Sequence, residues 1–168
     1  GQACGYAIGM QLTIIAVGSL REKYWREAAR EYERRLLPYT KVRIQEIPPE
    51  RVSDENSPVQ VLQALQKEAA KIRKALPGNQ TLVVLDVAGR SMSSPELAAW
   101  LEQEATYGRG SVTMLIGGSY GLDSSLLAQA DLKLSFSAFT FPHQLMRVIL
   151  LEQIYRAIKI QRGEAYHK

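Results

Sequence analysis

His143 and Arg147 are the two side chains of this sequence that are best placed to do chemistry together. They stand at positions i and i+4 after Pro142, where a long apolar-periodic helix is predicted to begin. Residues at this spacing lie on one face of a helix, and proline fits a first helical turn because its missing N–H would have no partner there. A histidine and an arginine beside the free amides of a helix start favour a ligand site. The alternative is a solvated histidine on a surface helix.

Glycines follow two predicted strands at points where the chain could wrap around a ligand. Residues 116–121 read Ile-Gly-Gly-Ser-Tyr-Gly, and residues 85–89 read Leu-Asp-Val-Ala-Gly. The first segment lacks the spacing of the dinucleotide-binding fingerprint, and no Gly-Lys-Ser/Thr follows it as in a P-loop. Tight turns without a ligand are the alternative interpretation. Hydrolase chemistry has little support, because Ser119 is not in a Gly-x-Ser-x-Gly elbow.

Strands and helices alternate along the chain, which indicates an α/β fold with a mostly parallel sheet flanked by helices. In open α/β sheets, ligands bind beyond the carboxyl ends of the strands. We therefore expect residues 85–89, 116–121 and 136–141 to converge on one edge and form a pocket for a nucleoside-type ligand. The predicted strands are residues 11–17, 42–47, 81–87, 111–116 and 132–136, and the predicted helices are residues 22–37, 59–76, 95–107, 124–130 and 142–160. Ser93 or Ser94 is expected to cap the third helix, with Pro95 at its first position.

Composition points to one globular domain in a reducing compartment. The chain has 168 residues, a formal net charge of +4 and a single cysteine, Cys4. The charge permits a polyanionic partner without demanding one, and disulfides within the chain are impossible. No metal spacing is present, and no apolar run reaches the roughly 20 residues of a membrane helix. We expect a cytoplasmic protein whose domain spans residues 10–168, with residues 1–9 an upstream extension before Met10.

Two helices carry signals for partners. The first has a basic face, but Glu22–Arg26 and Glu31–Arg35 are favourable i,i+4 pairs, so a salt-bridged solvated face is favoured over a dedicated RNA-contacting one. The C-terminal helix is apolar nearly all round, which is more than the surface helix of a monomer needs. We favour a dimer interface for it, and a deeply buried core helix is the alternative.

Three stretches together resemble the RlmH family of SPOUT-class RNA methyltransferases. They are residues 116–122, residues 134–147 (Leu-Ser-Phe-Ser-Ala-Phe-Thr-Phe-Pro-His-Gln-Leu-Met-Arg), and the terminal Tyr166-His167. The similarity covers essentially residues 10–168. It implies a SPOUT (α/β-knot) fold with a C-terminal trefoil knot, and a homodimer with the site near the dimer interface. The implied activity is S-adenosylmethionine-dependent methylation of N3 of a pseudouridine in 23S (large-subunit) ribosomal RNA, with the assembled ribosome the expected substrate.

The resemblance also assigns residues to roles. His143 is a candidate base or orienting group, Arg147 could stabilise charge on the pyrimidine oxygens, and Tyr166 and His167 would contact the target base. The alternative for Arg147 and Arg156 is ion pairing with Glu152 or Glu164 on the helix surface. The alternative for Tyr166 and His167 is a frayed terminus without a function. The expected methyl-donor contacts are Leu85, Gly117, Gly118, Phe136, Ser137, Ala138, Phe139, Thr140 and Phe141, and the expected RNA contacts are Arg156, Tyr166, His167 and Lys168.

Two other classes of function compete with this interpretation. A non-catalytic ribosome-binding protein would use the basic first helix and need no cofactor pocket. A nucleotide-dependent oxidoreductase would need an acidic ribose-binding residue, for which Asp86 is an imperfect candidate. Binding of S-adenosylmethionine or of NAD would separate the three.

Overall fold

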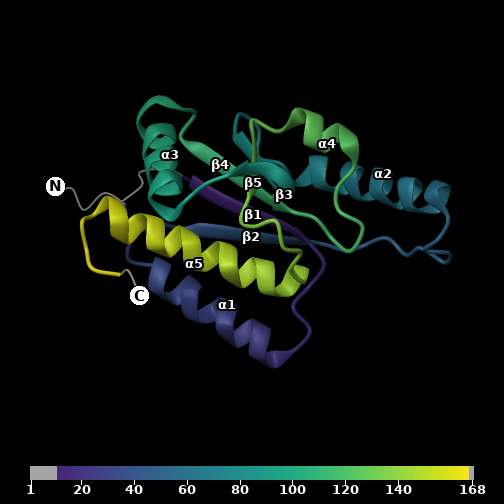
Figure 1. Cartoon of the computed structure of the whole chain (residues 1–168), viewed down its shortest axis with the longest axis horizontal. Helices are drawn as coiled ribbons and strands as arrows, with labels where there is room; N and C mark the ends of the chain where they lie inside the picture. Colours follow the sequence, from purple (N-terminus) through teal and green to yellow (C-terminus); the bar gives the residue numbers. More distant parts are fainter. Residues whose placement is uncertain (1–10, 167–168) are drawn as a thin grey trace.

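The computed structural model describes residues 11–166, so Met10, the segment before it, His167 and Lys168 lie outside the described part of the chain. A central sheet is covered by helices on both faces (Figure 1). The elements in chain order are β1 (Gln11–Val17), α1 (Lys23–Leu36), β2 (Val42–Ile47), α2 (Pro58–Ala75), β3 (Thr81–Ser91), α3 (Ser94–Tyr107), β4 (Ser111–Ile116), α4 (Ser124–Gln129), β5 (Leu132–Ser135) and α5 (His143–Gln161).

The sheet has five strands in the order β2-β1-β4-β3-β5, and each neighbouring pair is parallel. This confirms the α/β prediction. The order matters for the site, because β4, β3 and β5 are consecutive neighbours. Their carboxyl ends therefore lie side by side, and the loops that follow them must share one edge of the sheet.

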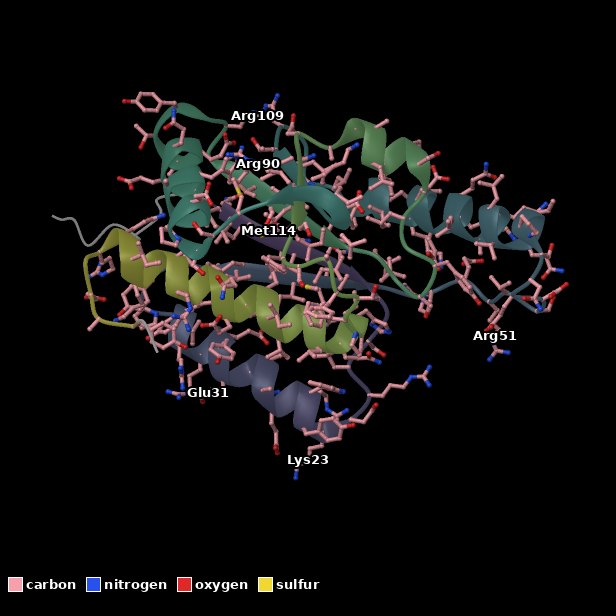
Figure 2. All side chains as sticks on the ribbon, in the orientation of Figure 1. Lys23, Glu31, Arg51, Arg90, Arg109 and Met114 are labelled. Carbon is pink, nitrogen blue, oxygen red and sulfur yellow. The ribbon has the colours of Figure 1, made fainter. Side chains whose placement is uncertain are left out.

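Two hydrophobic clusters, one on each face of the sheet, form the core. Along β1, Ile14 packs with helices α1, α3 and α5, while the next residue, Ile15, packs with α2 and α4. In β4, Met114 and Leu115 divide between the same two clusters, and all four side chains are fully buried. A continuous apolar run is the expected pattern for strands covered on both faces. Met114 lies in the sheet in Figure 2, whereas Lys23 and Glu31 project outward from α1.

Local sequence signals fix where the helices begin. The Ser57 side chain accepts a hydrogen bond from the Gln60 amide at the start of α2. Ser93 and Glu96 form a reciprocal capping box at the start of α3, with proline in the first turn. Pro142 is the N-cap of α5 rather than its first residue, so this helix begins at His143, one residue later than predicted. Within residues 11–166, no helix combines the length and the apolarity needed to cross a membrane.

Strand β3 is the main departure from the predicted elements. It continues to Ser91 rather than ending at Val87, and its pairing with β5 shifts register between Leu85 and Arg90. The intervening residues bulge out of the ladder, and the Asp86 carboxylate accepts a hydrogen bond from the Ala88 amide within the bulge. Such a bulge redirects side chains locally, and this one lies at the sheet edge where the three loops meet.

Candidate active site

A cavity of about 770 Å³ opens at the β3 bulge and at the carboxyl ends of β4 and β5. Its size is in the range of small-molecule sites, which typically hold about 300–1,000 Å³. The three segments predicted to converge do meet here, together with the first turn of α5, although residues 85–89 belong to the bulge of β3 rather than to a loop after it. The lining residues are Leu85, Asp86, Val87, Ile116, Gly117, Gly118, Ser119, Tyr120, Gly121, Leu122, Leu127, Leu134, Phe136, Ser137, Phe139, Thr140, Phe141, Pro142, His143, Gln144 and Met146.

The turn after β4 can only be built with a glycine at position 117. A Cβ placed there would lie 2.7 Å from the carbonyl oxygen of Gly121 and 2.9 Å from Leu122 Cγ. The turn closes through a hydrogen bond of 3.1 Å from the Gly121 amide to the Gly118 carbonyl. Bare backbone therefore forms this wall of the cavity, and a ligand can approach its amide and carbonyl groups closely.

The loop after β5 is held by its own short polar side chains. The Ser135 hydroxyl lies 3.1 Å from both the Val87 and the Ser137 carbonyl oxygens, which ties the loop to the β3 bulge. The Ser137 hydroxyl in turn accepts a hydrogen bond from the Phe139 amide at 3.0 Å. Eight of the nine residues predicted to contact the methyl donor line the cavity. The ninth, Ala138, is exposed and lies outside the lining.

His143 is the first residue of α5, and its side chain is part of the cavity lining. Its ring packs against the turn after β1, because a Cβ built at Gly18 would lie 3.1 Å from His143 Cε1. Burial, and then the nearby Arg147 guanidinium, lower the pKa of His143 below its ordinary value of 6.5. The imidazole is therefore neutral at physiological pH, the form that can accept a proton.

Arg147 lies one turn further along α5 and is buried, with its side chain 5% exposed. It donates to Glu46 Oε2 at 2.6 Å and to the Gly18 carbonyl at 3.1 Å, and is not part of the cavity lining. The ion pair therefore joins α5 to the ends of β1 and β2. The partner is Glu46 rather than Glu152 or Glu164, because the sheet brings β2 under this part of α5.

The Glu46–Arg147 pair gives a stability prediction. We expect Glu46→Gln to lower the free energy of unfolding by about 1–2 kcal/mol, because it removes the carboxylate that is hydrogen-bonded to a buried guanidinium. The effect is smaller than for a fully buried pair because Glu46 is partly solvated. Urea denaturation measures the change. Glu27→Gln, which removes an exposed pair with Lys23, is the matched control and should change little. Equal effects in the two variants would contradict the role assigned to the pair.

The tail residue Tyr166 is ordered against the far half of α5. Its ring lies 4.9 Å from that of Tyr155 in an edge-on contact, and the Arg156 guanidinium lies 4.7 Å from the ring centre. Arg156 also pairs with Glu152 at 2.8 Å and donates to the Tyr166 carbonyl at 3.1 Å. Tyr155 follows His143 by twelve residues, which is about 18 Å along a helix. The structure thus separates Tyr166 and Arg156 from the cavity of their own chain, while His167 and Lys168 lie outside the described residues.

Several residues that line the cavity were not among the predicted methyl-donor contacts. Asp86 entered only as a weak ribose-binding candidate, and Tyr120 was given no role. Gln144 and Met146 follow His143 on the first turn of α5, and this position beside a candidate site residue was the sequence signal that could have identified them. Among the described residues, no group of three or more His, Cys, Asp or Glu side chains is arranged to hold a metal ion.

Comparison with known proteins defines the class. Residues 10–167 match the family model described as "Predicted SPOUT methyltransferase", and the chain belongs to this family. It is 53% identical over 159 residues to the ribosomal RNA large subunit methyltransferase H of Moorella thermoacetica, covering 95% of this chain and 99% of that relative.

Solved structures share the fold at low sequence identity. A probable methylase family protein from Haemophilus influenzae aligns with a TM-score of 0.54 at 15% identity, over 94% of this chain and 70% of that one. A putative methylase family protein from Neisseria gonorrhoeae aligns at 0.53 and 14%, over 92% and 85%. These likenesses concern the fold alone.

Proposed function

We propose that this protein transfers a methyl group from S-adenosylmethionine to N3 of a pseudouridine in large-subunit ribosomal RNA. The observation that carries the proposal is the cavity built by the three strand-end loops, in a chain 53% identical over nearly its whole length to a ribosomal RNA large subunit methyltransferase H. A non-catalytic ribosome binder would have no use for such a cavity. An oxidoreductase is disfavoured by the family match.

The cavity fits the chemistry of S-adenosylmethionine. Its walls combine apolar side chains such as Leu85, Leu122 and Phe136 with the bare backbone of the Gly117-Gly118 turn. An adenine ring needs apolar surfaces and backbone hydrogen bonds at its edge, and a ribose needs a few polar partners. We infer that Leu85, Gly117, Gly118 and the loop 136–141 hold the cofactor. When bound, it supplies an electrophilic methyl group on a positively charged sulfur.

The protein's own part in the reaction is positioning and the handling of one proton. The N3 atom of pseudouridine carries a hydrogen, which must leave as the N3–CH₃ bond forms and the S–CH₃ bond breaks. His143 is neutral and lies in the cavity wall, so we assign it the role of accepting this proton or a hydrogen bond from N3. Arg147 is assigned to holding α5 and the His143 turn in place, because its guanidinium is engaged by Glu46 and Gly18.

The pH dependence of methyl transfer follows from the lowered pKa of His143. Only the neutral imidazole accepts a proton, and protonation is delayed to a pH below 6.5. We expect kcat/KM to level off at pH values well above the lowered pKa and to fall tenfold per pH unit well below it. A pH–rate profile between about pH 5 and pH 8 tests this. His143→Gln should remove that limb, and an acid limb centred above pH 6.5 would contradict the assignment.

A homodimer would reconcile the two parts of the site. Tyr166 is docked along α5, away from its own cavity, so the RNA-facing tail would serve the cavity of a second copy. Leu145, Val148 and Ile149 on α5 are only partly buried in the single chain, and together they offer an apolar strip for such a contact. The trefoil knot and the cytoplasmic location of a ribosome-modifying enzyme belong to the same proposal.

The decisive experiment measures methyl transfer from labelled S-adenosylmethionine to isolated ribosomes, large subunits and free ribosomal RNA. Each substrate is prepared with and without prior pseudouridylation. We expect label in large-subunit RNA only from pseudouridylated substrate, with the modified atom assigned by mass spectrometry. Incorporation independent of pseudouridine would overturn the substrate assignment, and absence of S-adenosylmethionine binding would overturn the whole proposal.

A further inference from the structure

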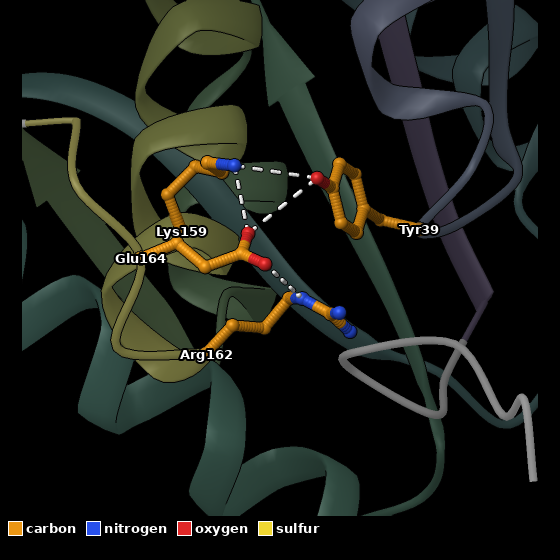
Figure 3. Close-up of polar contacts among 4 residues, drawn as sticks. All are labelled: Tyr39, Lys159, Arg162 and Glu164. Carbon is orange, nitrogen blue, oxygen red and sulfur yellow. Dashed lines mark hydrogen bonds and ion pairs between the residues drawn. The ribbon is translucent and has the colours of Figure 1, made fainter. Parts of the chain in front are cut away.

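Residues 162–166, which follow α5, form a turn and an irregular segment, and a specific cluster of side chains holds this segment. The cluster, here called the tail clasp, consists of Tyr39, Lys159, Arg162 and Glu164 (Figure 3). Tyr39 comes from the turn after α1, Lys159 from the last turn of α5, and Arg162 and Glu164 from the segment that follows. The clasp therefore joins segments that are about 120 residues apart in sequence.

Glu164 is the centre of the clasp. Its Oε1 accepts a hydrogen bond from Lys159 Nζ at 2.7 Å and lies 3.5 Å from the Tyr39 hydroxyl, while its Oε2 accepts from Arg162 Nε at 3.3 Å. Lys159 Nζ also lies 3.3 Å from the Tyr39 oxygen, so the three groups close a triangle. These bonds raise the pKa of Lys159 and lower the pKa of Glu164, which keeps both groups charged.

The backbone reversal at the end of α5 does not itself need this cluster. The Gly163 amide donates to the Ile160 carbonyl at 3.0 Å, and the Glu164 amide donates to the Lys159 carbonyl at 2.9 Å. Such bonds satisfy the last carbonyls of a helix. What the Glu164 side chain adds is a connection to Tyr39, on a different element, and this connection fixes the direction in which the chain leaves the reversal.

That direction places Tyr166. Two residues beyond Glu164, its ring packs on Tyr155 and lies beside Arg156. Burial and a hydrogen bond with Tyr32 raise the pKa of the Tyr166 phenol to about 12, so the phenol stays protonated and can donate a hydrogen bond. A chain leaving α5 at another angle would lose both contacts, because only Ala165 separates the clasp from this ring.

We propose that Glu164, held by Lys159 and Tyr39, is a positioning residue that presents Tyr166 to the RNA substrate. The proposal rests on the function proposed above, in which the tail meets the target base. In this proposal the tail clasp, whose residues do not line the cofactor cavity, contributes to methyl transfer only by orienting Tyr166.

The test compares Glu164→Gln with Tyr39→Phe and with the control Glu27→Gln, which lies on an exposed face of α1. Three measurements are made on the full chain: calorimetric binding of S-adenosylmethionine, kcat and KM for ribosomes, and hydrogen–deuterium exchange of the C-terminal peptide. For Glu164→Gln we expect about tenfold lower kcat, because misplacing a reacting group acts on the transition state. Cofactor affinity should stay within about twofold, and exchange after residue 161 should accelerate. Tyr39→Phe should show the same changes at smaller size.

The outcomes separate the two proposals. Unchanged tail exchange in Glu164→Gln, or faster exchange with normal kcat, overturns the positioning role. Loss of cofactor binding or of thermal stability in that variant also overturns it, because the effect would then be a general loss of structure. If the wild-type protein itself methylates no ribosomal substrate, the proposed function fails, and the exchange measurement then reports on the clasp alone.

Discussion

Tyr166→Ala is expected to bind S-adenosylmethionine with an affinity within about twofold of the wild type and to transfer methyl groups at least about 100-fold more slowly. The reason is the separation seen in the structure. The Tyr166 ring packs on Tyr155 and Arg156 rather than in the cavity wall, so its loss leaves the cofactor site intact. Its loss removes the aromatic group proposed to contact the target base, a contact that matters only once RNA is bound.

The measurement combines calorimetry with S-adenosylmethionine and a single-turnover transfer assay on ribosomes. Tyr107→Ala is the matched control, because Tyr107 is 80% exposed at the end of α3 and should be dispensable. His167→Ala is expected to behave like Tyr166→Ala. Normal turnover in both tail variants would remove the tail from the mechanism.

Gly117→Ala should have the opposite signature, with S-adenosylmethionine affinity falling about 100-fold. The new Cβ would lie 2.7 Å from the Gly121 carbonyl oxygen, well inside any normal contact distance, so the turn must open and its backbone groups must leave their positions. A loss of this size equals about 2.7 kcal/mol of binding free energy.

Gly78→Ala provides the control for this substitution, because a Cβ at Gly78 has no atom within 4 Å. Calorimetry gives the affinities, and thermal unfolding shows whether each variant is folded. A folded Gly117→Ala protein with wild-type affinity would exclude the glycine turn from the cofactor site.

Much of the fold followed from local pattern. The buried strands were visible as short apolar runs, and the prediction for residues 111–116 agrees with the observed strand β4 at both ends. The starts of α3 and α5 lie within one residue of the predicted ones, because the preferences of a capping serine and of proline act within one turn. The continuation of β3 beyond Val87 was missed, since its last residues pair with β5 only after a bulge that no local signal specifies.

The features of the site also divide into those that the local sequence predicts and those that depend on distant contacts. The three segments could be predicted to meet, because two of them follow parallel strands, the third lies at the bulge of the neighbouring strand β3, and parallel strands end on one edge. The contacts of Arg147 and of the tail could not be predicted, since their partners lie far away in the sequence. Arg147 pairs with Glu46, 101 residues away, and the clasp pairs Tyr39 with Lys159, 120 residues away. Sequence spacing along α5 gives no information about partners on β2 or after α1.

The strand order has a consequence for how the protein is made. β1 lies inside the sheet between β2 and β4, and its residue Leu12 pairs with Val112. Until β4 has been synthesised, one edge of β1 stays unpaired, and the remaining edge of β3 waits for β5 near the C-terminus. Pairings this distant close slowly, because the loop entropy is lost before the contacts form. Every wall of the cavity except the β3 bulge comes from residues after 115, so a nascent chain gains its binding site only after these residues have been synthesised.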